Sequence, residues 1–334
     1  MSNKLDEFSY YHWLTHISKH NFKSNSVIIL GSGNISKKYA EALFQMKISD
    51  VTIVSKTSSS EKLAKHYGFK SLIGGYENNL KNIPKSDLAI IALPVNLLLH
   101  ASRTLLELGH NNLLIEKPAS LYYKELEHLH KKYPRKKIHV AYNRILYPNL
   151  HKLKKLVLDE GGILSCKFSI TEQINRFKIS SNNLYVYKRL GIANTLHVIS
   201  MVVELIGYPK KLHAFQSGKI KWHQSGSIFV GSGITNQNIP FSYHGNWNTP
   251  GGWGIEILTK KRRYLLTPLE KLFYKNFNDD KWKPVKFKIS YPNVKAGMAE
   301  EIALMLNPNI KNILPTLVGA RKLNLFAEKI FGYD

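Results

Sequence analysis

The segment from Val27 to Ser36 constrains the fold of this chain more than any other. Four consecutive apolar residues, 27–30, run into the glycine pattern Gly-Ser-Gly-Asn-Ile-Ser at 31–36. A continuous apolar run that ends in a glycine turn is typical of a strand covered by helices on both faces of a parallel sheet. The apolar residues that follow recur at helical spacing, which predicts a helix over residues 36–46. A strand, a tight turn and a helix in this order indicate an α/β fold.

Strand and helix patterns alternate over the first part of the chain. After the first strand, apolar runs predict further strands over 51–55, 87–93, 112–115 and 137–142. Helical patterns lie between them, over 61–67 and in the segment that ends at Gly109. This order predicts a doubly wound parallel sheet with right-handed crossovers, the Rossmann architecture, over residues 25–146. Residues 1–24 form an extension before it, and apolar residues at helical spacing predict a helix over residues 7–19.

The pattern changes after Pro148. Helices are predicted over 150–158, 192–206, 298–306 and 317–331. Strands are predicted over 163–172, 211–216, 227–230, 241–247, 253–259 and 264–267. Strands that follow one another without helices favour antiparallel pairing. Residues 147–334 are therefore predicted to form an α+β domain with an open, mostly antiparallel or mixed sheet.

The glycine turn has the chemistry of a dinucleotide cradle. Gly31 permits the tight turn, Gly33 lets the backbone approach a phosphate, and Ser36 is small enough for close packing of helix on strand. The backbone N–H groups at the start of the helix, with its positive dipole end, suit a pyrophosphate. We expect the cofactor contacts here to come from Gly31, Ser32, Gly33, Asn34 and Ile35. The alternative is a tight strand-to-helix turn that binds no ligand.

The end of the second strand indicates which dinucleotide is bound. An acidic residue at this position usually binds the ribose 2′-hydroxyl of NAD. This chain has Ser55, Lys56 and Thr57 there, and two hydroxyls with an ammonium group suit a 2′-phosphate. The sequence therefore predicts NADP(H) as the preferred cofactor and NAD(H) as the alternative. Lys56 is otherwise one of many surface lysines.

Five motifs together resemble the glucose–fructose oxidoreductase and inositol dehydrogenase (Gfo/Idh/MocA) family. They are Gly31–Ser36, Ala89–Pro94, Leu108-Gly109 leading to Glu116-Lys117-Pro118, Ala141–Arg144, and His197 in a helix before Gly207. The resemblance implies a Rossmann domain followed by a substrate domain whose open sheet often forms an oligomer interface. It also implies NAD(P)-dependent oxidation or reduction of a hydroxyl group on a small-molecule sugar, polyol or nucleotide sugar, and a homo-oligomer formed through the C-terminal sheet.

The resemblance also implies roles for single residues. Cofactor contacts are expected from Leu93, Pro94, Glu116, Lys117 and Arg144, and substrate contacts from Lys117, Asn143, Lys188, Asn194 and His197. Hydride transfer from a carbinol carbon requires a base for the hydroxyl proton. Lys117 and His197 are the catalytic candidates for that proton. On sequence alone, a buried histidine of an apolar helix is the better reading of His197, and it is the resemblance that favours the catalytic role.

The helix that carries His197 departs from the family pattern. Many members place an aspartate one turn before the histidine, and often another one turn after it, where this chain has Asn194 and Ser200. An amide can orient the imidazole ring but cannot stabilise imidazolium as a carboxylate does. The departure motivates an alternative function, a catalytically weakened nucleotide-binding sensor or scaffold of the same fold.

The net charge of +25 is the one extreme value of the composition. Basic proteins collect phosphates, so a nucleic acid or another anionic partner is an alternative reading. The lysines are spread along the whole chain and accompany no nucleic-acid motif, which favours a solvated basic surface. This charge would also steer an acidic or nucleotide-linked substrate.

Other features place the chain in a reducing compartment. The single cysteine, Cys166, excludes an internal disulfide, and no run reaches the length of a membrane span. No secretory signal is expected, so a cytoplasmic location and no membrane partner are predicted. His12, His16 and His20 recur every four residues, but no carboxylate or cysteine joins them, and we expect no metal site.

Overall fold

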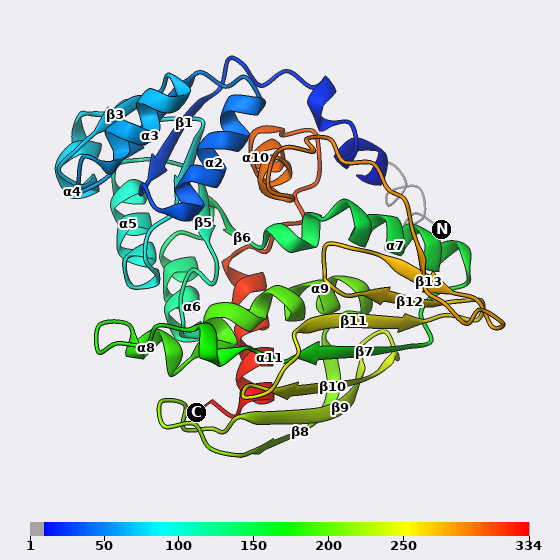
Figure 1. The fold of residues 1–334 in the computed structure, drawn as a ribbon. Helices are drawn as coiled ribbons and strands as arrows, with labels where there is room; N and C mark the ends of the chain where they lie inside the picture. The colour runs from blue at the N-terminus through cyan, green and yellow to red at the C-terminus, as the bar shows by residue number, and fades with distance from the viewer. Residues whose placement is uncertain (1–9, 334) are drawn as a thin grey trace. The chain divides into compact units, whose positions relative to one another are not determined.

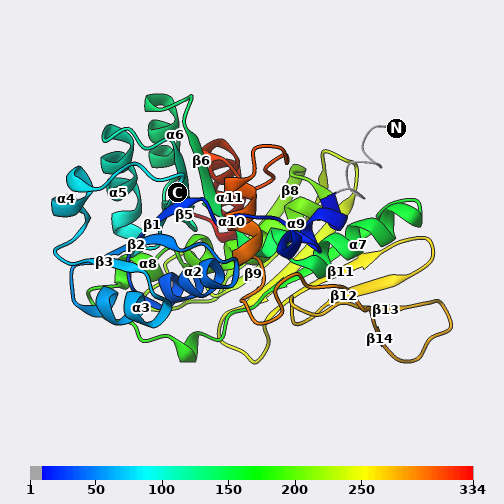
Figure 2. The ribbon, with the colours of Figure 1, turned by 90° about the horizontal axis from the view of Figure 1, so that it is seen from above.

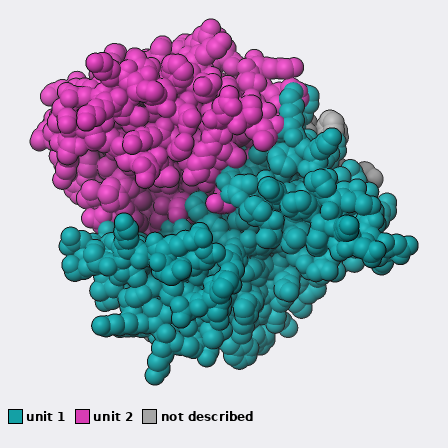
Figure 3. All heavy atoms as spheres, viewed as in Figure 1, with its two compact units in different colours: residues 1–13, 147–288, 323–334 teal, residues 14–146, 289–322 magenta. Residues whose placement is uncertain are grey.

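The computed structural model describes residues 10–333. The chain divides into two compact units. Unit 1 contains residues 1–13, 147–288 and 323–334, and unit 2 contains residues 14–146 and 289–322 (Figure 3). Each unit is built around one sheet.

The sheet of unit 2 has six parallel strands in the order β3-β2-β1-β4-β5-β6. The strands are β1 (Ser26–Leu30), β2 (Asp50–Val54), β3 (Lys70–Leu72), β4 (Leu88–Ile91), β5 (Asn112–Glu116) and β6 (Lys137–Ala141). Helices α2 (Asn34–Gln45) and α3 (Ser59–Tyr67) lie on one face, and α5 (Val95–Glu107) and α6 (Tyr123–Lys132) on the other (Figures 1 and 2). The predicted Rossmann architecture is confirmed.

The hydrophobic pattern explains this strand order. β1 lies between β2 and β4, with Ile29 in register with Ile53 and Ile90, and all three side chains are buried. A strand covered on both faces needs apolar residues at every position, which is why β1 and β4 lack alternation. Gly109 follows α5 with φ of +87°, the conformation that ends a helix most readily in glycine.

A segment distant in sequence completes unit 2. Residues 289–322, which the sequence prediction assigned to the C-terminal domain, lie in unit 2 together with α10 (Met298–Leu306). The backbone N–H of Val140 donates to the carbonyl of Pro315 at 2.8 Å, which ties this segment to β6. Helix α10 also packs on α2. Nothing in the local pattern of α10 distinguishes a helix of one unit from a helix of the other.

The sheet of unit 1 has eight strands in the order β14-β13-β12-β11-β7-β10-β9-β8. β7 and β10 are parallel, and the other neighbours are antiparallel, so the sheet is mixed and mostly antiparallel as predicted. The strands are β7 (Ser165–Ile170), β8 (Pro209–Ser217), β9 (Ile228–Thr235), β10 (Pro240–Asn246), β11 (Trp253–Leu258), β12 (Arg263–Leu266), β13 (Phe273–Lys275) and β14 (Lys283–Pro284).

One face of this sheet is buried and the other is open. Phe168, Tyr243 and Ile255 are buried, whereas their neighbours Lys167 and Ser242 are exposed. Helix α9 (Leu196–Ile206) packs on β7 and β11 (Figure 1). The remaining helices of unit 1 are α7 (Pro148–Asp159) and α8 (Leu184–Tyr187), and α11 (Leu317–Phe331) runs from unit 2 into unit 1.

Three local features differ from the predictions. The short strands β3, β13 and β14 were not predicted, because two or three residues are too few for a periodic signal. The helix predicted over 192–206 begins with a π-helical turn, η5 (Gly191–Thr195). Of the predicted N-terminal helix over 7–19, residues 7–9 lie outside the described part, residues 10–14 are helical, and 17–19 form a 3₁₀ turn.

Residues 10–333 lack two features. No helix there is both long enough and apolar enough to cross a bilayer. No group of three His, Cys, Asp or Glu side chains in that part of the chain could hold a metal ion.

Candidate functional site

The glycine turn after β1 has the backbone geometry that a phosphate requires. Gly31 has φ of +112°, and a Cβ atom there would lie 2.3 Å from the carbonyl oxygen of Ala92. A Cβ atom on Gly33 would meet no atom within 4 Å, so the backbone is open on that side. Gly33 caps α2 without any side-chain hydrogen bond to its first turn. The N–H groups at the start of α2 therefore suit an anionic ligand such as a pyrophosphate.

Hydroxyl groups connect this turn to the predicted ribose position. Ser32 Oγ lies 2.6 Å from Ser59 Oγ, and Ser59 Oγ lies 2.8 Å from Thr57 Oγ1. Ser55 is buried and donates its hydroxyl hydrogen to the carbonyl of Thr57 at 2.5 Å. Lys56 is exposed. Residues of the two predicted cofactor motifs thus lie side by side in unit 2.

The other predicted cofactor residues follow neighbouring strands at the same edge of the sheet. Leu93 and Pro94 follow β4, Lys117 follows β5, and Arg144 follows β6. Open α/β sheets bind their ligands outside the carboxyl ends of their strands. Leu93, Lys117 and Arg144 are each partly exposed there. Unit 2 therefore collects its predicted residues at the edge where a dinucleotide binds.

Asn143 has a role in the packing of unit 2. Its side chain is 4 % exposed, and its amide N–H donates to the carbonyl of Ala296 at 2.9 Å. A Cβ atom on the next residue, Gly297, would lie 2.3 Å from the carbonyl oxygen of Asn143. Asn143 thereby joins the end of β6 to the start of α10. The substrate contact expected of it stays a prediction.

The second group of predicted residues lies in unit 1, around the start of α9. Asn194 belongs to the π-helical turn and donates its amide hydrogens to both oxygens of Glu172, at 3.1 and 3.2 Å. Thr195 donates its hydroxyl to Glu172 at 2.7 Å. The indole N–H of Trp253 donates to the same carboxylate at 3.2 Å. Glu172 is 6 % exposed and supplies, from the loop after β7, a carboxylate that the helix sequence lacks.

The prediction did not include Glu172. The sequence assigned it to the last position of a strand, and only its place at the carboxyl end of that strand could have indicated a site. Nothing in the spacing of Glu172 and Asn194, 22 residues apart, indicates that they meet.

His197 lies in the first turn of α9 and is partly exposed. Its ring lies 6.0 Å from the ring of Trp253, measured between centroids, at an interplanar angle of 53°. Ser200 donates its hydroxyl to the backbone carbonyl of His197 at 3.0 Å, a bond within the helix. Lys188 follows α8 and is exposed. Glu172 and Trp253 therefore connect the predicted residues Asn194 and His197 within unit 1.

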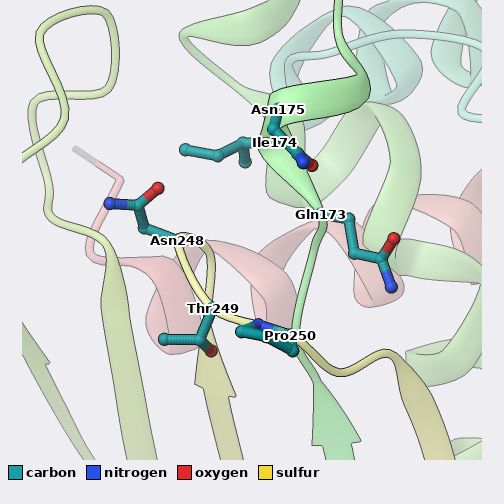
Figure 4. A pocket seen from close by; sticks show the side chains of 6 residues that line it. All are labelled: Gln173, Ile174, Asn175, Asn248, Thr249 and Pro250. Atoms are coloured by element: carbon teal, nitrogen blue, oxygen red, sulfur yellow. The ribbon is translucent and has the colours of Figure 1, made fainter.

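A pocket of about 280 Å³ lies beside this group in unit 1. Two loops face each other across it, one after β7 and one after β10 (Figure 4). The lining residues are Gln173, Ile174, Asn175, Asn248, Thr249 and Pro250. Gln173 donates its amide hydrogen to the carbonyl of Gly251 at 2.7 Å and so ties the two loops together. Three amides and one hydroxyl line the pocket together with the apolar side chains of Ile174 and Pro250, and none of these six side chains is charged. Such a lining can bind a neutral ligand that has both hydroxyl groups and apolar surface.

Comparison with known proteins agrees with this fold. Residues 25–143 match the family described as "Oxidoreductase family, NAD-binding Rossmann fold". A stretch of 101 residues is 32 % identical to the shikimate dehydrogenase (NADP(+)) of Methanothermobacter thermautotrophicus. That match covers 28 % of this chain and 36 % of the relative, so the chain spans little more than a third of the relative's length.

Solved structures resemble almost the whole chain. UDP-N-acetylglucosamine 3-dehydrogenase from Acidithiobacillus ferrooxidans is 14 % identical with a TM-score of 0.70, over 92 % of this chain and 97 % of that one. A levoglucosan dehydrogenase in complex with NADH is 16 % identical with a TM-score of 0.74, over 92 % and 95 %. An inferred NADPH-dependent oxidoreductase from Desulfitobacterium hafniense is 15 % identical with a TM-score of 0.77, over 93 % and 96 %. Identities this low show a shared fold. Residues 25–143 are thus similar to the Gfo/Idh/MocA oxidoreductases and match their NAD-binding Rossmann fold.

Proposed function

We propose that this chain is an NAD(P)-dependent oxidoreductase that transfers a hydride to or from a secondary hydroxyl or ketone of a sugar, polyol or nucleotide sugar. The observation that carries the proposal is the common edge of the unit 2 sheet, where the glycine turn and Lys117 follow strands of the same sheet. Two proteins of the same fold are dehydrogenases of sugar compounds by their names, which supports this substrate class.

The cofactor would lie along this edge. The N–H groups at the start of α2 hold the pyrophosphate, and the open face of Gly33 admits it. Lys56 and Thr57 would hold the 2′-phosphate of NADP(H), since an ammonium and a hydroxyl group donate hydrogen bonds and neither carries a negative charge. Ser55 would shape this turn, because its hydroxyl hydrogen is donated to the carbonyl of Thr57. NAD(H) is the alternative cofactor. When bound, the nicotinamide accepts the hydride in oxidation and supplies it in reduction.

Lys117 and His197 are the two candidates for transfer of the hydroxyl proton. In oxidation, one of them takes the hydroxyl proton as the hydride leaves the carbon, and in reduction it returns that proton. Asn194 orients the imidazole of His197, and Glu172 fixes the amide of Asn194 by accepting both of its N–H contacts. The amide oxygen of Asn194 then remains for the imidazole or for a substrate hydroxyl.

The substrate would extend into the pocket between the loops after β7 and β10. Its amide and hydroxyl groups can exchange hydrogen bonds with the hydroxyls of a sugar. The net charge of +25 would increase the rate at which a nucleotide sugar or another acidic sugar derivative arrives.

We also propose that the chain forms a homo-oligomer through the open face of the unit 1 sheet. Phe215 of β8 is 65 % exposed on this sheet, beside Val230 of β9. An aromatic side chain at an exposed strand position is typical of a contact surface. Phe215→Glu should lower the mass measured by sedimentation to that of the monomer. Phe277→Glu, at a position 88 % exposed outside the strands, is the matched control. A monomeric wild-type protein would rule this out.

Fluorescence titration with NADPH and NADH, followed by turnover of candidate sugars, tests the proposed function. We expect NADPH to bind more tightly than NADH. Lys117→Ala should lower turnover roughly 100-fold or more and weaken NADPH binding far less than that. Lys124→Ala, which removes an exposed lysine of α6, should change neither. Failure to bind either nucleotide would contradict the proposal, and tight binding without turnover of any sugar would favour the sensor or scaffold instead.

A further inference from the structure

Two carboxyl groups of unit 2 meet at one buried tyrosine hydroxyl. Tyr39 of α2 is fully buried, and its Oη lies 3.0 Å from Glu116 Oε1 and 3.0 Å from Glu301 Oε2. Glu116 ends β5 and Glu301 belongs to α10. The backbone N–H of Lys117 donates to the carboxyl group of Glu116. A continuous set of hydrogen bonds therefore leads from α10 through α2 to the proposed catalytic lysine.

The number of hydrogens in this set fixes its protonation state. A tyrosine hydroxyl has one hydrogen and can fully satisfy one of the two carboxyl groups. If both carboxyls were ionised, the second would face an oxygen lone pair instead of a donor. One of the two must therefore carry a proton and donate it to the oxygen of Tyr39. The pair then holds one proton and one negative charge.

Burial decides which of the two is protonated. Glu301 is 0 % exposed, and its Oε1 is buried without a hydrogen-bond partner among the described residues. Glu116 is partly exposed, and its carboxyl group lies beside the ammonium group of Lys117. An ionised carboxylate with a bare oxygen in an apolar interior is far less stable than one beside a cation. The proton belongs to Glu301 and the charge to Glu116.

We propose that Glu301 stands as a neutral carboxylic acid and, through Tyr39, holds Glu116 as the ionised partner of Lys117. Glu301 donates to the oxygen of Tyr39, and Tyr39 donates to Glu116 Oε1. Tyr39 and Glu301 are thus positioning residues for Lys117. This role rests on the proposed function, whereas the protonation of Glu301 does not.

The charged and titratable neighbours agree with this assignment. Burial raises the pKa of Glu301 well above its usual range, and the charge of Glu116 raises it further. The neighbouring Glu300 on α10 also raises it, while Lys295, which precedes α10, opposes the shift. Burial raises the pKa of Glu116 as well, but Lys117, the hydrogen bond from Tyr39 and Lys295 lower it.

The test has an arm that needs no substrate. Infrared spectra of the wild-type protein should show the C=O stretch of a protonated carboxylic acid between about pH 8 and 9. At that pH Glu300 is mostly ionised, because burial raises its pKa only to about 7. The band should disappear in Glu301→Gln and remain in Glu300→Gln, the adjacent control on the same helix. A band that Glu301→Gln leaves unchanged would overturn the proposal.

A second arm measures the role toward Lys117. Glu301→Gln should stay within roughly threefold of wild type in kcat/KM, because its amide N–H still donates to Tyr39. Tyr39→Phe should lower kcat/KM roughly tenfold, the loss expected when a charged group loses one hydrogen bond. The pH dependence of kcat/KM in Tyr39→Phe should also be shifted from that of the wild type. If Tyr39→Phe has the wild-type profile, or if Glu301→Gln is as damaged as Tyr39→Phe, the positioning role is wrong. If no sugar is turned over, the proposed function fails while the infrared arm still decides the protonation of Glu301.

Discussion

Tyr333 and His223 share a hydrogen bond of 2.8 Å between Oη and Nε2, inside unit 1. Nδ1 of His223 lies 2.8 Å from the carbonyl of Gly226, so the ring hydrogen is on Nδ1 and Tyr333 donates to Nε2. The oxygen of Tyr333 in turn accepts the backbone N–H of Gly191 at 2.9 Å. Gly191 begins the π-helical turn that leads to His197. A neutral histidine is therefore built into the support of the helix that carries the second catalytic candidate.

This neutral histidine predicts loss of stability in acid. Burial lowers the pKa of His223 to about 4, from the 6.5 of an exposed histidine. Below pH 6.5 the unfolded chain binds a proton that the folded chain refuses, so stability present above pH 6.5 is lost as the pH falls toward 4. The loss reaches up to about 3 kcal/mol. Urea unfolding at pH 7 and at pH 4.5 measures this loss. In His223→Gln, the free energy of unfolding should decrease less between the two pH values than it does in the wild type. A variant as acid-sensitive as the wild type would contradict this.

Glu300 predicts a change of stability in the opposite direction. Burial raises its pKa to about 7, against 4.5 for an exposed glutamate, despite hydrogen bonds from its own N–H and that of Gly297. The folded chain then holds a proton that the unfolded chain releases. Stability present below pH 4.5 is lost as the pH rises through 7, by up to about 3 kcal/mol. The free energy of unfolding of Glu300→Gln, relative to that of the wild type, should be higher at pH 8 than at pH 5. An equal difference at both values would show that Glu300 does not titrate in this range.

The position of Lys56 leads to a prediction about the preference for NADPH over NADH. Lys56→Glu should weaken NADPH binding roughly tenfold or more by placing a carboxylate beside the 2′-phosphate, and should change NADH binding far less. Lys65→Glu, an exposed lysine in the last turn of α3, carries the same change of charge and should leave both affinities near wild type. Equal losses in the two variants would mean that only the overall charge matters. Fluorescence titration at fixed ionic strength measures all four affinities.

Substitution of Glu172 should lower turnover without changing the affinity for NADPH. Glu172→Gln keeps the shape but removes the charge that Asn194, Thr195 and Trp253 all donate to. We expect kcat to fall roughly tenfold, since a misplaced Asn194 no longer orients His197. The affinity for NADPH should be unchanged, because the predicted cofactor residues lie in unit 2. Circular dichroism checks that the variant is folded. An unchanged kcat would show that Glu172 only stabilises unit 1.

The Rossmann sheet could be predicted because its signals are local. The apolar runs of β1 and β4 and the two glycines at 31 and 33 belong to single elements, and each element tolerates few alternatives. The order of strand and helix then restricts how the sheet is connected. The cofactor residues were predicted by the same rule, since each of them ends or follows a strand of one parallel sheet.

Features that depend on distant residues could not be predicted. Glu172 binds Asn194 across 22 residues, and Tyr39 meets Glu301 across 262 residues. The assignment of 289–322 to unit 2 rests on pairing with β6 and packing on α2, neither of which leaves a periodic pattern in that segment. Alternation and helical spacing show which face of an element is buried but not which partner covers it.

The single acceptor at Glu172 makes the start of α9 a place where substitution effects will not add. Three donors from two parts of the chain depend on one carboxylate, so removing the carboxylate releases all of them together. In a variant without the Glu172 carboxylate, the hydrogen bonds of Asn194 and Thr195 to it are already lost, so a further substitution at either residue should have little effect. Each of those changes made alone leaves the buried charge short of a donor. Double-mutant cycles at this point should therefore give large coupling energies, and single substitutions there will overstate what each side chain contributes.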